Sequence, residues 1–412
     1  MNDTTANLIS KIEQHKEEMK NFLIEICSIP ALGPMNGGGG ENEKSMKISE
    51  IVKSWDKNNR LKFEWLNAED KKAKHGVRTN LIITYPGKSE RNLWVIAHTD
   101  IVPVGEREKW SVDPFKPEYK NGKLIGRGVE DNGQAICASL FALKVLLDED
   151  IYPKYTIKIA LVADEETNST YGIRYLIAQN LFSKEDLFLV PDRGSKNGLE
   201  IEVAEKSILW VRFVTHGKQV HGSMPHTGVN AFTTAMKFYL ALEKELSKKF
   251  AKRNKLFEPR FSTFEPTKKE PNIENINTIP GKDVFYMDCR ILPIYKVDDV
   301  LKSMKKVSSK IAKKMGAKIE LEIVYREDAA PPTPENAEIV TLLKKAIKTI
   351  RKKEPYVVGV GGGTCAAFLR KIGCHVAVSE KTEQTAHAPD EYVLLDNVVS
   401  DAKVYAILFS EQ

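Results

Sequence analysis

The amino-acid sequence predicts an α/β catalytic domain that is interrupted by a smaller α+β domain. Apolar runs of strand length alternate with helical patterns over residues 1–206 and again over residues 328–412. Between them, residues 207–327 carry strands in which apolar and polar residues alternate. This pattern is typical of an antiparallel sheet with one face exposed to solvent. Because 412 residues exceed what one compact core usually holds, we expect two separate domains.

The first part of the catalytic domain is expected to alternate between helices and strands. Apolar residues at helical spacing predict helices over 6–28, 44–55, 133–147 and 171–179. Short apolar runs bounded by turn residues predict strands over 80–84, 93–97, 157–163 and 187–190. This order predicts a sheet with helices on both faces, which binds ligands beyond the carboxyl ends of its strands.

The insert and the last part of the chain follow the same rules. Alternation predicts insert strands over 208–215, 284–291 and 318–325. One insert helix should begin after Asn230, a good N-cap, and another should run over 297–315 and end at Gly316. Beyond the insert we expect helices over 336–352 and 396–409, strands over 357–360 and 375–378, and a short helix between those strands.

Composition argues against several classes of protein. The net charge of +6 comes from lysines dispersed over helical patterns, which indicates solvated helix faces, and no nucleic-acid motif is present. No apolar run approaches the roughly 18 residues that span a bilayer, and the first residues lack a signal-peptide core. Five cysteines without CxxC spacing favour a reducing cytoplasm over a disulfide scaffold.

Metal-ligand residue types follow several of the predicted strands. His98 and Asp100 lie two residues apart, so in an extended chain both side chains leave one face. Asp100 can then accept a proton from one imidazole nitrogen while the other nitrogen binds a cation. Glu165 and Glu166 offer two adjacent carboxylates, one to bind metal and one to move protons, and Asp192 follows the next strand. The pattern indicates a metallohydrolase.

Each of these residues also has an ordinary structural interpretation. Asp131 can be a helix N-cap, the pair Glu165–Glu166 can begin a helix, and Asp192 can be a turn residue. Arg290 can pair with Asp288 on a wet strand. The metallohydrolase is favoured because the ordinary interpretations require several ligand-type residues to collect at one sheet edge by chance.

The sequence resembles the co-catalytic di-zinc amidohydrolases and metallopeptidases. That family includes acetylornithine deacetylase, succinyl-diaminopimelate desuccinylase, aminoacylase and glutamate carboxypeptidase. The resembling blocks are residues 98–103, 126–133, 164–166, 221–231, 277–280, 288–290, 362–364 and 387. Residues 130–134, Glu-Asp-Asn-Gly-Gln, depart from the Asp-Met-Lys-Gly common in deacylases and are closer to peptidase members.

The resemblance implies a fold and a cofactor. The catalytic domain would be phosphorylase/hydrolase-like, with a central mixed sheet flanked by helices. The insert would be a ferredoxin-like lid and dimerisation domain. Two zinc ions would bind each chain, with cobalt or manganese as substitutes. Asp131 would bridge both ions and precede a cis peptide bond. His98 and Asp192 would complete one site, and Glu166 and His387 the other.

The resemblance also implies the roles of the remaining residues. Glu165 would be the general base, and Asp100 would orient His98. His221 of the partner subunit would stabilise the oxyanion. Arg290, Asn277 and the backbone around Gly363 would hold a substrate carboxylate.

We therefore expect a cytoplasmic, homodimeric di-zinc hydrolase that binds neither nucleic acid nor membrane. Its substrate would be an N-acyl amino acid with a free carboxylate, cleaved by a desuccinylase-like or deacetylase-like reaction. The alternative within the enzyme class is a dipeptidase or carboxypeptidase acting on short peptides. Outside it, the alternatives are a basic nucleic-acid-binding module and a metal-binding scaffold without turnover. The retention of Glu165 beside Glu166 disfavours the scaffold.

Overall fold

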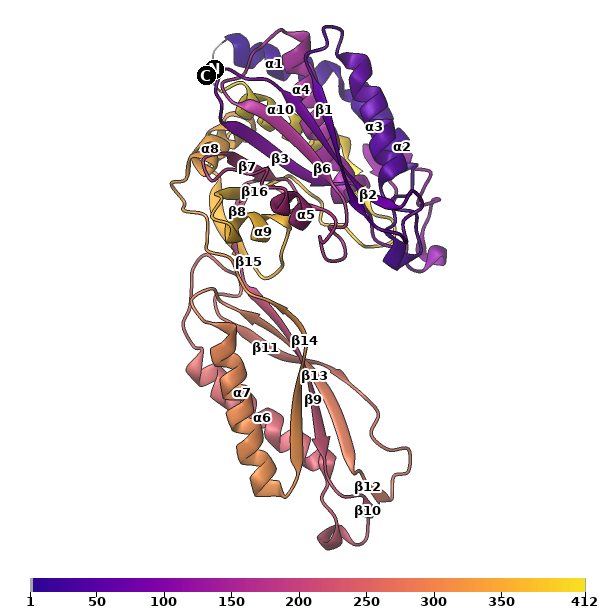
Figure 1. Cartoon of the computed structure of the whole chain (residues 1–412), viewed down its shortest axis with the longest axis vertical. Coiled ribbons are helices and arrows are strands. Elements are labelled where there is room, and N and C mark those ends of the chain that lie inside the picture. The colour runs from indigo at the N-terminus through magenta and orange to yellow at the C-terminus, as the bar shows by residue number, and fades with distance from the viewer. Residues whose placement is uncertain (1–2, 412) are drawn as a thin grey trace. The chain divides into compact units, whose positions relative to one another are not determined.

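The computed structural model describes residues 3–411, so the outermost residues of the predicted catalytic domain, 1–2 and 412, lie outside the described residues. The chain divides into two compact units (Figure 1). The first consists of Met1–Val203, Pro332–Val358 and Thr364–Gln412, and the second of Ala204–Pro331 and Gly359–Gly363. The short segment 359–363 belongs to the second unit although it is separated in sequence from the rest of that unit. No local sequence pattern predicts this assignment.

The first unit is built around a mixed eight-stranded sheet (Figure 1). In spatial order its strands are β1 (Lys62–Glu69), β2 (Val77–Tyr85), β6 (Thr156–Val162), β3 (Asn92–His98), β7 (Leu187–Val190), β16 (Val376–Val378), β8 (Glu200–Glu205) and β15 (Tyr356–Val360). The central strands β6, β3, β7 and β16 are parallel. A small three-stranded sheet contains β17 (Tyr392–Leu394), β5 (Lys123–Ile125) and β4 (Glu118–Lys120).

Helices flank both faces of this sheet. They are α1 (Asp3–Gln14), α2 (Lys16–Cys27), α3 (Asn42–Trp55), α4 (Ala135–Asp148), α5 (Ile173–Ala178), α8 (Glu338–Arg351), α9 (Cys365–Lys371) and α10 (Leu395–Phe409). Helices α5 and α9 share a hydrophobic core with the central strands, while α4 packs on β3 and β6 and is covered by α10. The predicted mixed α/β fold with helices on both faces is confirmed.

The central strands are continuously apolar because both of their faces are buried. In β3, Leu93 to Ile96 are fully buried, and Val95 pairs with Ile159 on one side and Leu189 on the other. Strands that are buried on both faces do not alternate apolar and polar residues, as strands with one solvent-exposed face do. Short apolar runs were therefore sufficient to predict β3, β6 and β7 within one or two residues.

The opening helix was predicted wrongly as one element over residues 6–28. The structure has two helices, α1 and α2, separated at His15. The backbone of His15 departs from helical geometry (φ −83°, ψ 2°), and its imidazole Nδ1 lies 2.8 Å from a carboxylate oxygen of Glu18. Apolar periodicity continues through such a local turn, so the pattern alone cannot reveal the break.

Several strands were not predicted, and they lie mostly at sheet edges. Strand β1 lies at the edge of the sheet, paired with β2, and its exposed positions are polar or charged. In the second unit, β11 (Thr263–Lys269) is interrupted by a register shift between Pro266 and Lys268. Edge strands need neither a continuous apolar run nor regular alternation, because one side and part of a face stay in water.

The second unit is an antiparallel sheet covered by two helices on one face (Figure 1). The strand order is β11, β13 (Lys282–Ile291), β9 (Ser207–His216) and β14 (Lys318–Glu327), and a separate pair joins β10 (Val220–His221) to β12 (Thr278–Ile279). The helices are α6 (Ala231–Lys249) and α7 (Val297–Met315). Asn230 caps α6 by accepting the Thr233 amide at 2.9 Å, and Gly316 ends α7 with φ 68°, as predicted.

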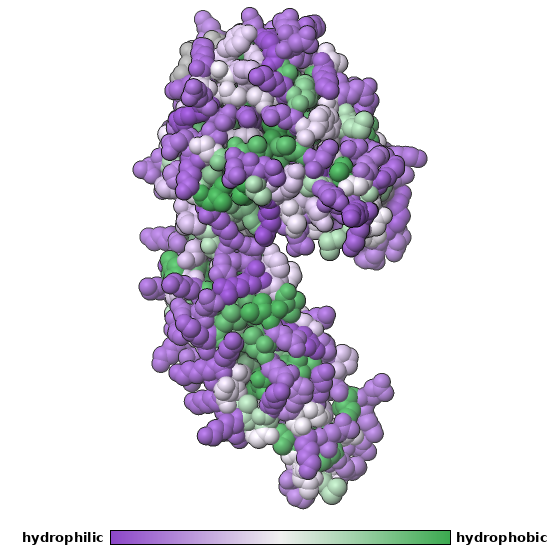
Figure 2. Space-filling model, in the orientation of Figure 1, coloured by the Kyte–Doolittle hydropathy of each residue, from purple (hydrophilic) through white to green (hydrophobic). Residues whose placement is uncertain are grey.

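The two faces of this second sheet differ sharply in chemistry. Leu209, Val211 and Phe213 of β9 point into the core beneath α6 and α7. Alternate residues Trp210 and Arg212 lie on the opposite face, and Trp210 remains 41% exposed. The surface of this unit accordingly shows apolar residues among hydrophilic ones (Figure 2).

A membrane-spanning helix is not found in the part of the chain that the structure describes, since none of its helices is both long and apolar enough.

Candidate active site

Three neighbouring parallel strands end at one edge of the first sheet and bring the predicted ligands there. Strand β3 ends at His98, β6 is followed by the pair Glu165–Glu166, and β7 is followed by Asp192. The carboxyl ends of parallel strands meet at the same edge, so these side chains converge although they are far apart in sequence. His98 is almost fully buried, with 2% of its side chain exposed.

Asp131 and His387 reach the same place from two connecting segments. Asp131 lies in the irregular turn Val129–Gln134, before α4, and a cis peptide bond follows it, as the resemblance implied. His387 lies in the loop between β16 and β17, with a left-handed backbone (φ 66°). Neither residue comes directly after a strand, so a search for ligand-type residues at the ends of predicted strands would not have found them.

The carboxylate of Asp131 lies between two groups of side chains. Its Oδ1 is 2.9 Å from Nε2 of His98, and that nitrogen is 3.3 Å from Oδ1 of Asp192. Its Oδ2 is 3.0 Å from Nε2 of His387, and that nitrogen is 3.2 Å from the Glu166 carboxylate. One aspartate therefore joins two histidine–carboxylate groups through its two different oxygens.

This arrangement fits two divalent cations. Tetrahedral ligands at 2.0–2.1 Å from zinc stand roughly 3.3 Å from one another, close to the separations within each group. Nitrogen and oxygen donors without thiolate suit zinc, cobalt or manganese. His98, Asp131 and Glu166 offer ligand atoms within 4.8 Å of one another, and so do His98, Glu165 and Asp192. The donors present thus match the predicted cofactor in type and spacing.

Among the protein groups alone, both histidines have raised pKa values. Burial opposes a charge on His98, but the nearby carboxylates of Asp192, Asp100 and Asp131 outweigh it and raise its pKa well above the ordinary value. Hydrogen bonds to Asp131 and Glu166 raise the pKa of His387 to about 10. A metal ligand must be neutral imidazole, so metal binding at these residues would release protons.

The adjacent glutamates behave as a buried like-charged pair. Burial, with Asp192 as a neighbouring charge, raises the pKa of Glu165 well above its usual value. Burial also raises the pKa of Glu166 to about 7, although His387 opposes the shift. A cluster of acids this crowded needs compensating positive charge, which is the electrostatic condition that bound cations supply.

Asp100 does more than the predicted orientation of His98. Nδ1 of His98 lies 3.0 Å from the backbone carbonyl of Asp100 and 3.5 Å from its carboxylate. The same carboxylate accepts the backbone amides of Glu165 at 3.1 Å and Glu166 at 3.0 Å. Asp100 therefore joins the end of β3 to the glutamate pair after β6, a contact that sequence reasoning missed.

The ordinary interpretations of Asp131 and of the pair Glu165–Glu166 are wrong, whereas that of Asp192 is confirmed. Asp131 does not cap α4, which begins at Ala135, and its carboxylate contacts histidines instead. The pair Glu165–Glu166 does not begin a helix, because α5 starts at Ile173. Asp192 does lie in a turn, but its carboxylate contacts His98 and accepts from the Asn132 side chain at 3.0 Å.

Comparison with known proteins agrees with this geometry. Residues 94–411 match the model of peptidase family M20/M25/M40. The chain belongs to this family. A protein of Methanocaldococcus jannaschii named as an uncharacterized metallohydrolase is 39% identical over 405 residues, covering 94% of this chain and 98% of that relative. The resemblance found in the sequence is thus confirmed, and the chain is a metal-dependent hydrolase.

The chain is also similar to a more distant relative and to a solved structure. Succinyl-diaminopimelate desuccinylase of Roseobacter denitrificans is 28% identical, covering 76% of this chain and 81% of that protein. The crystal structure of aminopeptidase PepT from Bacillus cereus aligns with a TM-score of 0.76 and 20% identity, covering 96% of this chain and 98% of that chain. At that identity the structural match shows a shared fold alone.

The four remaining predicted residues of this family member lie in its second unit. His221 on β10 is exposed, and its Nδ1 contacts the Ser223 hydroxyl at 2.7 Å. Asn277 lies across from it, accepting the Gly222 amide through its backbone carbonyl at 2.6 Å. Gly363 ends the segment that joins this unit from the later part of the chain.

Arg290 on β13 is held by two groups of its own unit. Its Nε and Nη2 donate to the Asp288 carboxylate at 2.7 and 2.9 Å, and its Nη1 donates to the Gly361 carbonyl at 2.7 Å. The predicted pairing with Asp288 is therefore confirmed. A guanidinium has five N–H donors, so these three bonds leave two, one on each terminal nitrogen.

Two buried glutamates beside the ligands were missed by sequence reasoning. Glu130 precedes Asp131 and accepts backbone amides of the loop that carries His387, while Glu391 accepts the amides of Glu130 and Asp131. Their only sequence signal is that each lies within four residues of a predicted ligand. Acidic residues are common near turns, so this signal could not have singled them out.

Proposed function

We propose that the chain is a di-zinc hydrolase that cleaves the amide bond of an N-acyl amino acid bearing a free carboxylate, in a desuccinylase-like or deacetylase-like reaction. The observation that carries the proposal is the Asp131 carboxylate, whose two oxygens face two separate histidine–carboxylate groups. Family membership supports a hydrolase, and the relatives named succinyl-diaminopimelate desuccinylase favour this substrate class.

The ligand sets follow from these contacts. His98 and Asp192 would hold one zinc ion, Glu166 and His387 the other, and Asp131 would bridge them. Cations held there supply Lewis-acid polarisation of the substrate carbonyl and of water. The backbone carbonyl of Asp100 fixes the His98 ring through Nδ1, which leaves Nε2 facing the site.

Glu165 is proposed as the general base because it is half-buried beside His98 and Asp192, and because the two ligand sets proposed above do not include it. It would take a proton from the attacking water and pass it to the leaving amine nitrogen, so that C–N cleavage yields a carboxylate and an amine. Asp100 supports this transfer by holding the backbone amides of Glu165 and Glu166, which fixes both carboxylates relative to the end of β3.

The second unit is proposed to recognise the substrate. The two remaining N–H donors of Arg290 match a carboxylate, with help from Asn277 and the backbone around Gly363. His221 of the partner subunit would donate from Nε2 to the developing oxyanion, since Nδ1 is occupied by Ser223.

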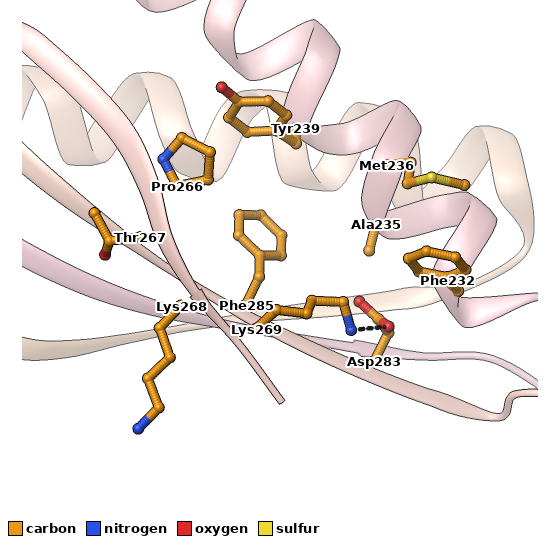
Figure 3. A pocket seen from close by; sticks show the side chains of 10 residues that line it. All are labelled: Phe232, Ala235, Met236, Tyr239, Pro266, Thr267, Lys268, Lys269, Asp283 and Phe285. Carbon is orange, nitrogen blue, oxygen red and sulfur yellow. Dashed lines mark hydrogen bonds and ion pairs between the residues drawn. The ribbon is translucent and has the colours of Figure 1, made fainter. Parts of the chain in front are cut away.

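A homodimer formed through the second unit is part of this proposal. Helix α6 exposes Phe232, Met236 and Leu240, at 39%, 46% and 61%. Beside it lies a mostly apolar groove of about 320 Å³ between α6 and the edge strand β11 (Figure 3). A second copy of the chain is the proposed occupant, because exposed apolar side chains beside an edge strand are typical of a surface that a subunit covers. Dimers by light scattering that persist in Met236→Asp would contradict this surface.

We place the enzyme in the cytoplasm. All five cysteines are buried and unpaired as free thiols, which favours a reducing compartment.

A peptidase is the second candidate within the same chemistry. It is favoured by residues 130–134, which depart from the deacylase pattern. A dipeptidase or carboxypeptidase would use the same metal centre on a short peptide with a free carboxyl terminus. Side-by-side turnover of a dipeptide panel and an acetyl- and succinyl-amino acid panel separates the two.

The proposed function is tested by metal content and reconstitution. Protein purified without chelator is analysed for metals, stripped, and titrated with Zn²⁺ while amide hydrolysis is followed. We expect two ions per chain and activity that returns as they bind. Fewer than one ion per chain, with no hydrolysis restored by Zn²⁺, Co²⁺ or Mn²⁺, would show that the ligand set does not assemble.

A further inference from the structure

Two segments far apart in sequence carry the predicted bridging ligand and one of its partners. Residues 127–131 include Asp131, and residues 383–391 include His387. Each segment also contains a glutamate that is buried and that the proposed mechanism does not use. Glu130 is 2% exposed and Glu391 is 0% exposed. Burial of a carboxylate is costly unless its oxygens are satisfied, so their partners are informative.

Glu130 is satisfied almost entirely by the backbone of the other segment. One oxygen accepts the amide of Glu383 at 2.6 Å. The other accepts the amides of Thr385 at 2.5 Å and Ala386 at 3.0 Å, and the Thr385 hydroxyl at 2.8 Å. These donors immediately precede His387 in the chain. One carboxylate therefore sets the path of the loop up to the metal ligand.

Glu391 makes the converse contact. Its Oε1 accepts the amides of Glu130 at 3.0 Å and Asp131 at 3.1 Å. Its Oε2 accepts from the Arg127 guanidinium at 2.5 Å, and that guanidinium also donates to the His387 carbonyl at 3.3 Å. A carboxylate of the second segment thus fixes the backbone of the first at the bridging ligand.

The loop needs such support because its backbone is unfavourable. Gln384 and His387 both have positive φ, at 62° and 66°, in the left-handed region that residues other than glycine rarely adopt. Conformations of this kind persist only where surrounding contacts over-determine them. The hydrogen bonds to Glu130 bracket Gln384 and end one residue before His387.

We propose that Glu130 and Glu391 are positioning residues that form a reciprocal clamp. Each reaches from one ligand-bearing segment to the backbone of the other, so Asp131 and His387 are held at their mutual spacing before metal binds. The inference rests on the proposed function for the identity of the ligands. The clamp itself consists of protein contacts and exists without metal.

The test compares Glu130→Ala with a matched control in the same loop. Glu383→Ala removes a carboxylate that accepts from Asn397 at 3.0 Å but leaves the Glu383 amide in place. Hydrogen exchange is measured in the metal-free full chain, and Zn²⁺ affinity by competition with a chromophoric chelator. Glu130→Ala should speed exchange of the Thr385 and Ala386 amides at least about 10-fold and weaken Zn²⁺ binding by roughly 10–100-fold. The control should change neither.

The isosteric variant Glu391→Gln provides a second test in case Glu130→Ala does not fold. Its amide keeps one oxygen for the Glu130 and Asp131 amides but loses the ion pair with Arg127, so a smaller weakening of Zn²⁺ binding is expected. Folded variants with wild-type exchange and wild-type Zn²⁺ affinity would overturn the clamp. A wild-type chain that binds no divalent metal would overturn the proposed function, and the exchange rates of the metal-free variants would still decide the clamp.

Discussion

The predicted metal site of the first unit and the open sheet face of the second unit are built differently. The predicted ligands of the first range from buried His98 to exposed His387, and buried carboxylates accept the backbone amides of Asp131 and Glu166. Residues of the second, such as Arg290 and Trp210, are partly exposed and bonded to neighbours on their own sheet, Asp288 foremost. Rigid, desolvated groups suit chemistry, whereas an accessible face suits recognition. Metal binding should therefore depend on the first unit, and substrate preference on the second.

The largest effect is expected when the proposed base is removed from the first unit. Glu165→Gln keeps the size of the side chain but cannot take a proton, so kcat should fall by about 10²–10⁴. Bound metal should stay at the wild-type level. An amide-hydrolysis assay measures kcat, and elemental analysis of the same preparation measures the bound metal. Turnover within about tenfold of wild type, with metal retained, would show that Glu165 is not the base.

The next largest effect should fall on the stability of the second unit alone. Phe238 is fully buried between α6 and the sheet, with its ring 5.0 Å from that of Phe213. Phe238→Ala should cost about 3–5 kcal/mol of unfolding free energy. Denaturation followed by limited proteolysis should show that the second unit opens first, while Zn²⁺ content stays unchanged. Loss of metal from this variant would contradict the independence of the two regions.

A moderate effect is expected at the proposed recognition face. Arg290→Ala should lower kcat/KM by about 10²-fold for substrates with a free carboxylate, mostly through KM, because a charge-assisted pair is lost. Arg212→Ala, on the same face but bonded to Glu322, is the matched control. With substrates whose carboxylate is amidated, wild type and Arg290→Ala should react alike. A uniform loss on both substrates would assign Arg290 a structural role instead.

The smallest effect concerns pH and a buried acid of the first unit. Burial, with Asp401 and Asp192 nearby, raises the pKa of Glu380 well above its usual value. The folded chain then keeps a proton that the unfolded chain has lost, so this group favours folding below pH 4.5 and the advantage disappears as pH rises toward the folded pKa. Glu380→Gln should therefore stabilise the metal-free protein at pH 8, by about 1.4 kcal/mol per tenfold difference in proton affinity. At pH 5 the gain should be smaller, as urea melts at both pH values would show.

Sequence patterns predicted the elements whose environment is uniform along their length. Strands β3, β6 and β7 are buried on both faces, and α7 ends at a glycine with positive φ, so local residues sufficed. The break at His15 and the edge strands β1 and β11 were missed because their cause is a side-chain contact or a neighbouring strand. Of the predicted site residues, those of the first unit lie together in the structure. Their roles, and those of His221, Asn277, Arg290 and Gly363 in the second unit, stay predictions.

What the sequence by itself determined is therefore which residue types stand at the ends of buried strands, and with them the reaction class. Apolar runs followed by His98 and by Glu165 indicate a functional site when they occur together, because a charge close to the end of a buried strand needs a partner. Only the tertiary structure decided how those ligands are held. Glu130 and Glu391 lie more than 250 residues apart and meet through backbone amides, which every residue type except proline presents alike, so no pattern of side chains could reveal that contact.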